Sequence, residues 1–334
     1  MLLSSREVRG RGLQERSRGV GRHRGGARRH RDRPHREGSP RHPHGEALRA
    51  LQEVLVIPFA AVLLLLAASV ASAAEYRGPI IDAHGHVPNA TAVDAYVAAM
   101  KKHNVTRVLL LGVGGVQKDD VAWIAAAAKK HPGVVVPGAP VADPSDAGVA
   151  KAAEALDALK ARALGEVHGR QVSRKIDRDP ARFGKLFELA ASRGVPVIIH
   201  LELTDAAAKQ LEAALAAHRK TTVVIAHGGE GPPARVEGLL ARNTNLFFDL
   251  SGMHFQRKPA LATETGPLDP AWKAVIEKHG DRFLMGIDVW APRLFEPPTL
   301  DKLMAWTRRI LGEIKPEVAE RVASKNAAAL FKLE

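Results

Sequence analysis

The sequence predicts an α/β fold in which eight parallel strands alternate with helices, a (β/α)8 TIM barrel, with an additional helix at the C-terminus. Short apolar runs alternate with helical patterns from residue 79 onward, which favours parallel strands joined by helical crossovers. The apolar runs are continuous, as expected for strands covered by helices. Residues 74–334 also have about the usual length of such a barrel. The alternative is a doubly wound open sheet, which the lack of a glycine-rich dinucleotide fingerprint disfavours.

The expected strands are short and rich in Val, Ile and Leu. They span residues 80–84, 106–112, 133–137, 162–168, 196–200, 221–227, 245–250 and 282–288. The expected helices carry apolar residues three and four positions apart, and Ser145 and Gly194 are typical of a helix start and a helix end. They span residues 90–103, 120–130, 145–160, 179–193, 205–218, 233–242 and 270–279, with closing helices over 299–311 and 316–333.

Residues 1–50 hold 14 Arg and 5 acidic residues, a charge of +9 out of the +13 of the whole chain. Such a segment has too little apolar surface to fold, so we predict a disordered Arg-rich extension. An RNA-binding arm and a start codon assigned too far upstream are the alternatives. Residues 74–334 hold 35 basic and 30 acidic residues, only +5, so nucleic acid is not an expected partner of the folded domain.

Residues 51–73 resemble a secretory signal peptide. An apolar core from Val54 to Val70 follows Arg49, and the small residues Ala71-Ser72-Ala73 close it. We expect cleavage after Ala73, hence export to the periplasm or the medium without stable membrane insertion. An uncleaved N-terminal membrane anchor is the alternative, because the apolar core is long enough for one.

The chain contains no cysteine, so any metal must be held by His, Asp, Glu or backbone groups. His84 and His86 stand two positions apart in the first strand, Ile80-Ile81-Asp82-Ala83-His84-Gly85-His86. Residues two apart on a strand point to the same face, and neutral imidazole is a common ligand for zinc. The pair is therefore a candidate metal site, although polar residues at a strand end give the same pattern.

Polar side chains stand at or near the C-terminal ends of the other strands, where barrel enzymes carry their chemistry. They are Glu166, His168, His200, His227, Asp249 and Asp288. Each alone is consistent with a histidine at the rim of the barrel or a residue in a turn. Burying them together without a cation would cost several kcal/mol, which is about the penalty for unpaired buried polar groups and charges. The residues at the ends of the first, fourth, fifth, sixth and eighth strands, taken together, therefore predict a metal centre.

With these residues the chain resembles the amidohydrolase superfamily, and most closely its amidohydrolase-related (amidohydrolase 2) branch. The resemblance covers residues 79–333. It rests on Asp82-Ala83-His84-Gly85-His86, His200, His227 with Gly228-Gly229, Gly286-Ile287-Asp288 and Asn326–Phe331.

The resemblance implies that His84, His86, His200 and Asp288 bind metal. It also implies that His227 binds a second metal or orients water. Glu166 stands where many two-metal members have a carboxylated lysine, and it resembles the glutamate that can bridge two metals in TatD-like and some phosphotriesterase-like members. We therefore expect one or two divalent ions, Zn²⁺ first and Mn²⁺ as the alternative.

The activity implied is hydrolysis of an amide, lactone or ester bond of a small molecule, with water activated on the metal and Asp288 moving its proton. A single-metal decarboxylase or hydratase of the same family is one alternative, and a non-enzymatic exported binding protein is another. Candidate substrate-binding residues near the strand ends are His168, Arg170, His254, Arg257 and Trp290, and Arg170 or Arg257 could clamp a carboxylate. A homo-oligomer is compatible with the sequence.

Overall fold

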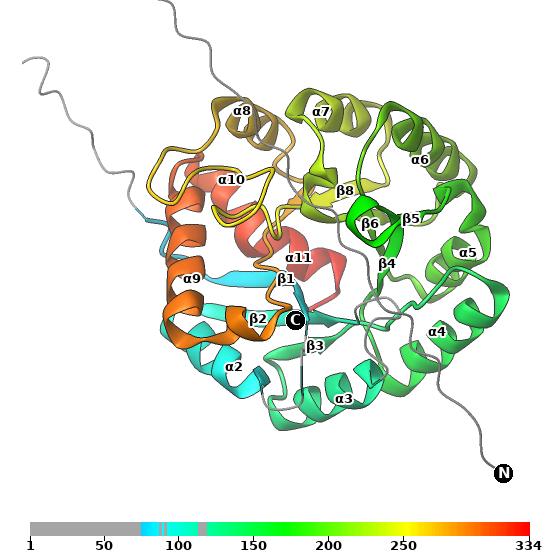
Figure 1. Ribbon diagram of the computed structural model, residues 1–334, viewed down its shortest axis with the longest axis horizontal. Coiled ribbons are helices and arrows are strands. Elements are labelled where there is room, and N and C mark those ends of the chain that lie inside the picture. The colour runs from blue at the N-terminus through cyan, green and yellow to red at the C-terminus, as the bar shows by residue number, and fades with distance from the viewer. Residues whose placement is uncertain (1–74, 87–88, 90–91, 113–118) are drawn as a thin grey trace, which may run out of the picture. The chain divides into compact units, whose positions relative to one another are not determined.

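The computed structural model describes residues 75–86, 89, 92–112 and 119–334 (Figure 1). The predicted Arg-rich extension and signal peptide lie outside the described residues and remain predictions. Among the described helices, none combines the length and apolar character that crossing a bilayer requires.

The strands form two sheets in which, apart from the short β5 at one edge, neighbouring strands follow the chain order. One sheet has the order β1-β2-β3 and the other β5-β4-β6-β7-β8-β9, and all pairs are parallel except β4 with β5. The strands are β1 Ile80–His86, β2 Val105–Leu111, β3 Val135–Pro137, β4 Leu164–Gln171, β5 Ile176–Asp177, β6 Val197–Leu201, β7 Val223–Ile225, β8 Leu246–Asp249 and β9 Phe283–Leu284.

Helices α2 to α9 surround the strands in Figure 1. Their bounds are α2 Ala92–Lys102, α3 Asp120–Lys130, α4 Asp146–Leu159, α5 Gly184–Arg193, α6 Asp205–Ala217, α7 Pro233–Arg242, α8 Pro270–Lys278 and α9 Pro297–Gly312. Short helical turns are η1 Val172–Arg174, η2 Pro180–Arg182, η3 Ala226–Glu230 and η4 Pro292–Phe295. The chain closes with α10 Pro316–Glu320, the π-turn η5 Arg321–Lys325 and α11 Asn326–Leu330.

The predicted boundary signals act as expected. Ser145 caps α4 by accepting a hydrogen bond from the backbone N–H of Gly148, and Gly194 ends α5 with a left-handed φ of 62°. Two predictions need correction. β5, which pairs antiparallel with the end of β4, was not expected, and residues 285–288 are not a strand. In that segment the backbone has positive φ at Asp288 (61°). The N–H of Ile287 donates to the side chain of Asp82 and that of Asp288 to the carbonyl of His84, both in β1, whereas the N–H of Met285 donates to the carbonyl of Val322.

Neighbouring residues of each strand enter different cores, which explains the continuous apolar runs. The larger core packs strands against helices and includes Ile80, Val108 and Val197. The second core takes the adjacent residues of the same strands, together with two residues at the end of the chain. It comprises Ile81, Ala83, Leu109, Leu111, Val136, Ala163, Ile198, Val224, Ala226, Leu284, Ala327 and Phe331.

Backbone hydrogen bonds join the two sheets at both gaps. At one gap the N–H of Gly165 donates to the carbonyl of Ala139, 2.9 Å away. At the other gap the N–H of Ala83 donates to the carbonyl of Met285 (2.9 Å), and that of Asp288 donates to the carbonyl of His84 (2.9 Å). The C-terminal ends of strands from both sheets are thereby held close together.

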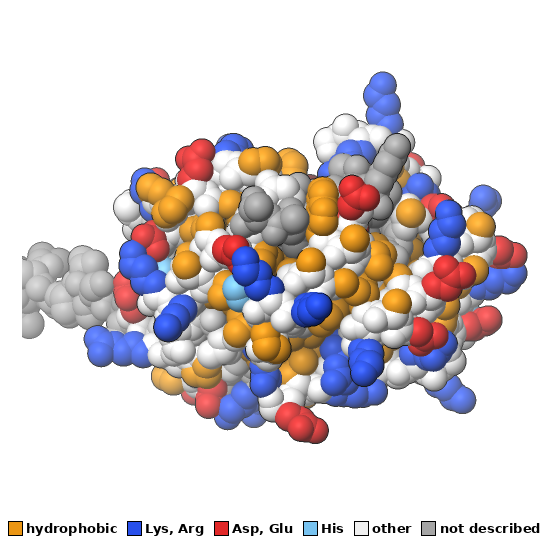
Figure 2. Space-filling view, turned by 90° about the horizontal axis from the view of Figure 1, so that it is seen from below, with side chains coloured by type: hydrophobic (Ala, Val, Ile, Leu, Met, Phe, Trp, Pro, Cys, Tyr) orange, Lys and Arg blue, Asp and Glu red, His pale blue; other side chains and the backbone are white. Residues whose placement is uncertain are grey.

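Acidic and basic side chains alternate over the face shown in Figure 2, with apolar side chains between them.

Candidate metal centre

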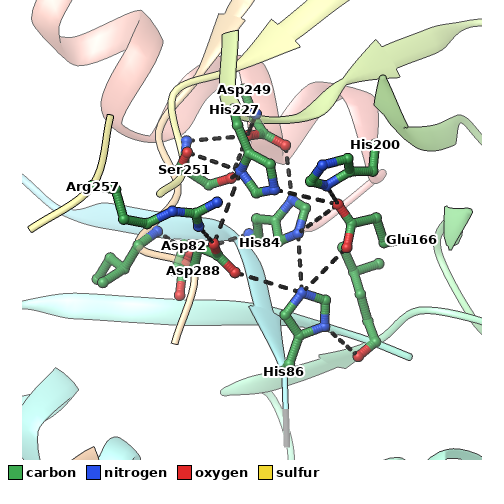
Figure 3. A network of polar contacts seen from close by, with 12 residues as sticks. Asp82, His84, His86, Glu166, His200, His227, Asp249, Ser251, Arg257 and Asp288 are labelled. Carbon is green, nitrogen blue, oxygen red and sulfur yellow. Dashed lines mark hydrogen bonds and ion pairs between the residues drawn. The ribbon is translucent and has the colours of Figure 1, made fainter. Parts of the chain in front are cut away.

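Six buried side chains from both sheets converge at the C-terminal ends of the strands (Figure 3). Each is at most 4 % exposed, and their nitrogen and oxygen atoms form overlapping groups within 4.8 Å of one another. The six are His84, His86, Glu166, His200, His227 and Asp288, the set that the sequence predicts as metal ligands.

The two histidines of β1 face each other, as their spacing predicts. Their Nε2 atoms lie 3.2 Å apart. The Nδ1 of His86 lies 3.0 Å from the carbonyl oxygen of Leu111, and the Nδ1 of His84 lies 2.9 Å from the carboxylate of Asp249. A carbonyl and a carboxylate only accept, so both Nδ1 atoms carry protons and each neutral ring keeps its lone pair on Nε2.

His227 presents its Nε2 in the same way. Its Nδ1 lies 3.0 Å from the carbonyl of Ser251, which fixes the proton there and leaves Nε2 3.3 Å from Oε1 of Glu166. His227 sits in a left-handed turn (φ 57°) that Gly228 and Gly229 continue at 59° and 66°. A side chain on Gly228 would meet Met253 and Trp272 at 2.7–2.9 Å, so glycine is needed there for space as well as for backbone freedom.

Glu166 lies at the centre of the cluster. Oε1 lies 2.9 Å from His200 Nδ1 and 3.8 Å from His84 Nε2, while Oε2 lies 3.6 Å from His86 Nε2. Burial opposes ionisation of this carboxyl, but in the metal-free site the ring N–H of His200, together with His227 and His84 when these are protonated on Nε2, holds its pKa well below the usual value. Glu166 is therefore a carboxylate whose two oxygens face different histidines.

His200 differs from the other three, because its Nδ1 rather than its Nε2 faces Glu166. Its Nε2 is buried and has no hydrogen-bond partner among the described residues, and the nearest acidic oxygen is Glu230 Oε1 at 3.7 Å. This Nε2 atom can therefore accept a hydrogen bond from a bound molecule, or bind a cation separate from one held by His84 and His86.

Asp288 divides its two oxygens between two neighbours. Oδ1 lies 3.6 Å from His86 Nε2, and Oδ2 accepts a hydrogen bond from Arg257. Burial raises the pKa of this carboxyl, but the charges of His227 and Arg257 lower it to about 2, so Asp288 is ionised at neutral pH.

The donor set fits a divalent cation. Two lone pairs facing each other at 3.2 Å repel unless a positive charge lies between them. Without a metal that charge is a proton, and the carboxylates of Asp249 and Glu166 overcome the effect of burial to raise the pKa of His84 well above normal. Two imidazole nitrogens bound tetrahedrally to zinc at about 2.0–2.1 Å would lie about 3.3–3.4 Å apart, close to the separation here.

Sequence reasoning placed Asp249 in a strand but assigned it no role in the site. The structure puts it directly behind His84. Its Oδ1 accepts from the backbone N–H groups of His227 and Ser251, both at 3.0 Å, while Oδ2 bonds His84. A buried carboxylate at the end of a strand was the available signal, since ligating histidines commonly donate their second nitrogen to one.

Asp82 is the second residue whose role was missed. Its Oδ1 accepts from the N–H groups of His84 (3.1 Å) and Ile287 (2.8 Å), and Tyr96 donates to Oδ2. Burial raises the pKa of Asp82 to about 6, although these hydrogen bonds oppose the shift. Asp82 thus joins β1 to the segment that carries Asp288.

A cavity of about 250 Å³ opens onto this cluster. Its walls include four of the five predicted substrate-binding residues, His168, His254, Arg257 and Trp290. Burial lowers the pKa of both His168 and His254 to about 4, so both rings are neutral at pH 7.

Arg170 does not line this cavity, although it was predicted among the substrate-binding residues. Its guanidinium pairs with Asp177 at 2.7 Å, and the next residue, Gln171, lines the cavity instead. The register of β4 against β6 shifts between His168 and Arg170, so simple alternation from Glu166 and His168 fails at this point.

The family model described as Amidohydrolase matches residues 81–333. A search of the curated proteins gives no match. An uncharacterised TIM-barrel protein from Bordetella bronchiseptica has a similar structure (TM-score 0.53, 17 % identity, 76 % of this chain and 99 % of that chain). So has an amidohydrolase from Burkholderia multivorans solved with bound zinc (0.54, 14 %, 77 % and 100 %). A TatD family hydrolase from Entamoeba histolytica is a third (0.53, 11 %, 77 % and 99 %).

Proposed function

Because the chain belongs to the amidohydrolase family and is therefore a hydrolase, we propose that it hydrolyses an amide, lactone or ester bond of a small molecule with one or two divalent metals. The observation that carries this proposal is the orientation of His84, His86 and His227. Each ring is fixed through Nδ1 and presents Nε2 to a common point beside Glu166 and Asp288.

We further propose that the two sheets are parts of one closed (β/α)8 barrel. The hydrogen bonds across both gaps support this, and so does the second core, to which strands of both sheets contribute. The likeness to a TIM-barrel structure supports it as well. A closed ring would put the metal centre at the mouth formed by the C-terminal ends of the strands.

The proposed metal is zinc, held by His84, His86 and Asp288 on one side. Glu166, His168 and His200 form the other group, and His227 faces Glu166 between them. Since the two oxygens of Glu166 face different histidines, this carboxylate would serve as a ligand to either group if two ions were bound. Imidazole and carboxylate ligands suit Zn²⁺, and Mn²⁺ is the second choice.

A bound divalent cation supplies two things, acidification of water from a pKa of 15.7 to roughly 7 and polarisation of a carbonyl. Asp288 accepts the proton of the attacking water on Oδ1 and passes it to the leaving group, while Arg257 holds Oδ2 and so fixes the carboxylate plane. The Nδ1 of His254 accepts from the N–H of Gln256 (3.3 Å), so the ring's proton is on Nε2, where it can donate to a substrate oxygen.

The test is elemental analysis of the purified full chain together with turnover on a panel of lactones, esters and amides. We expect one or two equivalents of zinc or manganese. Asp288→Asn should lose about 10²–10⁴-fold in kcat, the usual contribution of a general acid–base group, while most of the metal stays bound. Unchanged turnover in this variant would exclude the proton-transfer role. If the protein decarboxylated a substrate and hydrolysed none of the panel, the proposed hydrolysis would be wrong and the decarboxylase alternative would take its place.

We also propose that the protein is exported after cleavage at Ala73. N-terminal sequencing of protein recovered outside the cytoplasm should begin near Ala74, and a start near Met1 would contradict this.

A further inference from the structure

The wall of the cavity facing the metal centre carries three arginines, Arg174, Arg257 and Arg293. The acidic residues that line the same cavity, Glu166 and Asp288, are turned into the histidine cluster and are engaged there. Arg257 is paired with Asp288 and lies 3.7 Å from Glu230. Among the described residues, Arg174 and Arg293 form no ion pair. The side of the cavity left for a substrate is therefore cationic.

Arg174 gives the sharper signal of the two. It lies in turn η1, which connects β4 to β5. Its Nη1 is buried without a hydrogen-bond partner among the described residues. The side-chain oxygen of Gln171, the last residue of β4, is also buried without such a partner, but as an acceptor it calls for a donor rather than an anion. Burying a guanidinium N–H without an acceptor is unfavourable, so Arg174 favours an occupant that supplies acceptor oxygens.

The remaining lining is apolar on one side. Trp290, 42 % exposed, and buried Leu294 lie on the same cavity as Arg293. An occupant therefore needs an acceptor-rich anionic end, a scissile carbonyl that reaches the metal centre, and a short apolar part between them. The cavity of about 250 Å³ limits it to a small molecule.

We propose that the substrate is a small carboxylate-bearing ester, lactone or amide, and that Arg174 binds its carboxylate while Arg293 at the rim attracts the anion. This rests on the proposed hydrolysis at the same site. Guanidinium matches a carboxylate with two parallel N–H···O bonds, and a cationic wall raises the local concentration of anions. The carboxylate would supply the acceptors that Arg174 lacks.

The test compares the 4-nitrophenyl hemi-esters of C3–C6 dicarboxylic acids with 4-nitrophenyl esters of equal length that end in a methyl group. We expect wild type to prefer the hemi-ester, and Arg174→Gln to reduce kcat/KM for it by about tenfold or more. Activity on the neutral ester should stay within about twofold in the same variant. Arg174→Lys keeps the positive charge but loses the two parallel N–H donors of the guanidinium, so its kcat/KM for the hemi-ester should lie between those of wild type and Arg174→Gln. The matched control is Arg219→Gln, an exposed arginine that does not line the cavity.

A binding readout separates this inference from the proposed reaction. Calorimetry with malonate, succinate, glutarate and adipate should show binding that Arg174→Gln weakens by about tenfold, with no binding of the corresponding diamides and no change in metal content. Arg174-dependent dicarboxylate binding without hydrolysis of any ester would keep the anion site and exclude ester hydrolysis as the reaction at this site. Wild-type preference for the neutral esters, or equal behaviour of the Arg174 and Arg219 variants, would overturn the anion site.

Discussion

The same strands end in two very different environments. At their C-terminal ends, His84, His86, Glu166 and Asp288 bury ionisable groups against one another. The same strands also contribute Ile81, Leu109 and Ile198 to the second core, an apolar cluster that includes Phe331 near the end of the chain. Apolar burial stabilises the fold without a ligand, whereas buried ionisable groups need a partner charge. The molecule therefore separates the part that holds the strands together from the part that does the chemistry.

The largest effect expected from this contrast comes from the apolar end. Phe331 is 1 % exposed and lies in the second core, so Phe331→Ala should lower the free energy of unfolding by about 3–5 kcal/mol. Zinc content and kcat measured well below the melting temperature should stay at wild-type values. Chemical denaturation measures the free energy of unfolding, elemental analysis measures the zinc content, and a turnover assay measures kcat. Val121→Ala, at a position 40 % exposed, is the control and should change stability by less than about 0.5 kcal/mol.

A smaller effect is expected from the polar end, and it should appear in metal affinity rather than in folding. In Asp249→Asn, the amide oxygen must stay on the N–H groups of His227 and Ser251, so the NH₂ group faces His84 Nδ1. His84 must then accept at Nδ1 and carry its proton on Nε2, which removes the lone pair from the site. We expect zinc affinity to fall about 10–100-fold.

Zinc titration of metal-free protein in competition with a chelator measures this change. The control is Asp301→Asn, which alters a histidine–aspartate pair with His103 at the surface and should leave zinc affinity unchanged. An Asp249 variant that binds zinc as wild type does would show that the tautomer of His84 is set in some other way.

A third comparison, in which the difference expected between the two variants is about 1–3 kcal/mol, separates the effect of space from that of backbone conformation at glycines before and after the strands. Gly133, before β3, has φ 75° and open space where a Cβ would lie, whereas Gly228, after β7, has φ 59° and contacts at 2.7–2.9 Å. Both alanine variants should lose about 1–2 kcal/mol from the left-handed backbone. Gly228→Ala should lose about 1–3 kcal/mol more from overpacking, and only this variant should lose activity through His227. Equal losses of stability, measured by denaturant titration, would show that the turn after β7 adapts.

Several features of the fold could be predicted from the sequence because they depend on local rules. Alternation along a strand places His84 and His86 on one side, apolar runs without polar interruption indicate strands buried on both faces, and Ser145 and Gly194 mark helix ends. The gathering of ligand residues at the strand ends follows from parallel strands, since their C-terminal ends lie together.

Only the tertiary structure decided which side chains support the ligands. Asp249 is 165 residues from His84, and Arg257 is 31 residues from Asp288, so no local pattern links either pair. A register shift in the pairing of β4 with β6 lies between His168 and Arg170, and Gln171 rather than Arg170 lines the cavity. Side-chain alternation is a property of one strand, but register and the contacts across strands depend on the whole packed sheet.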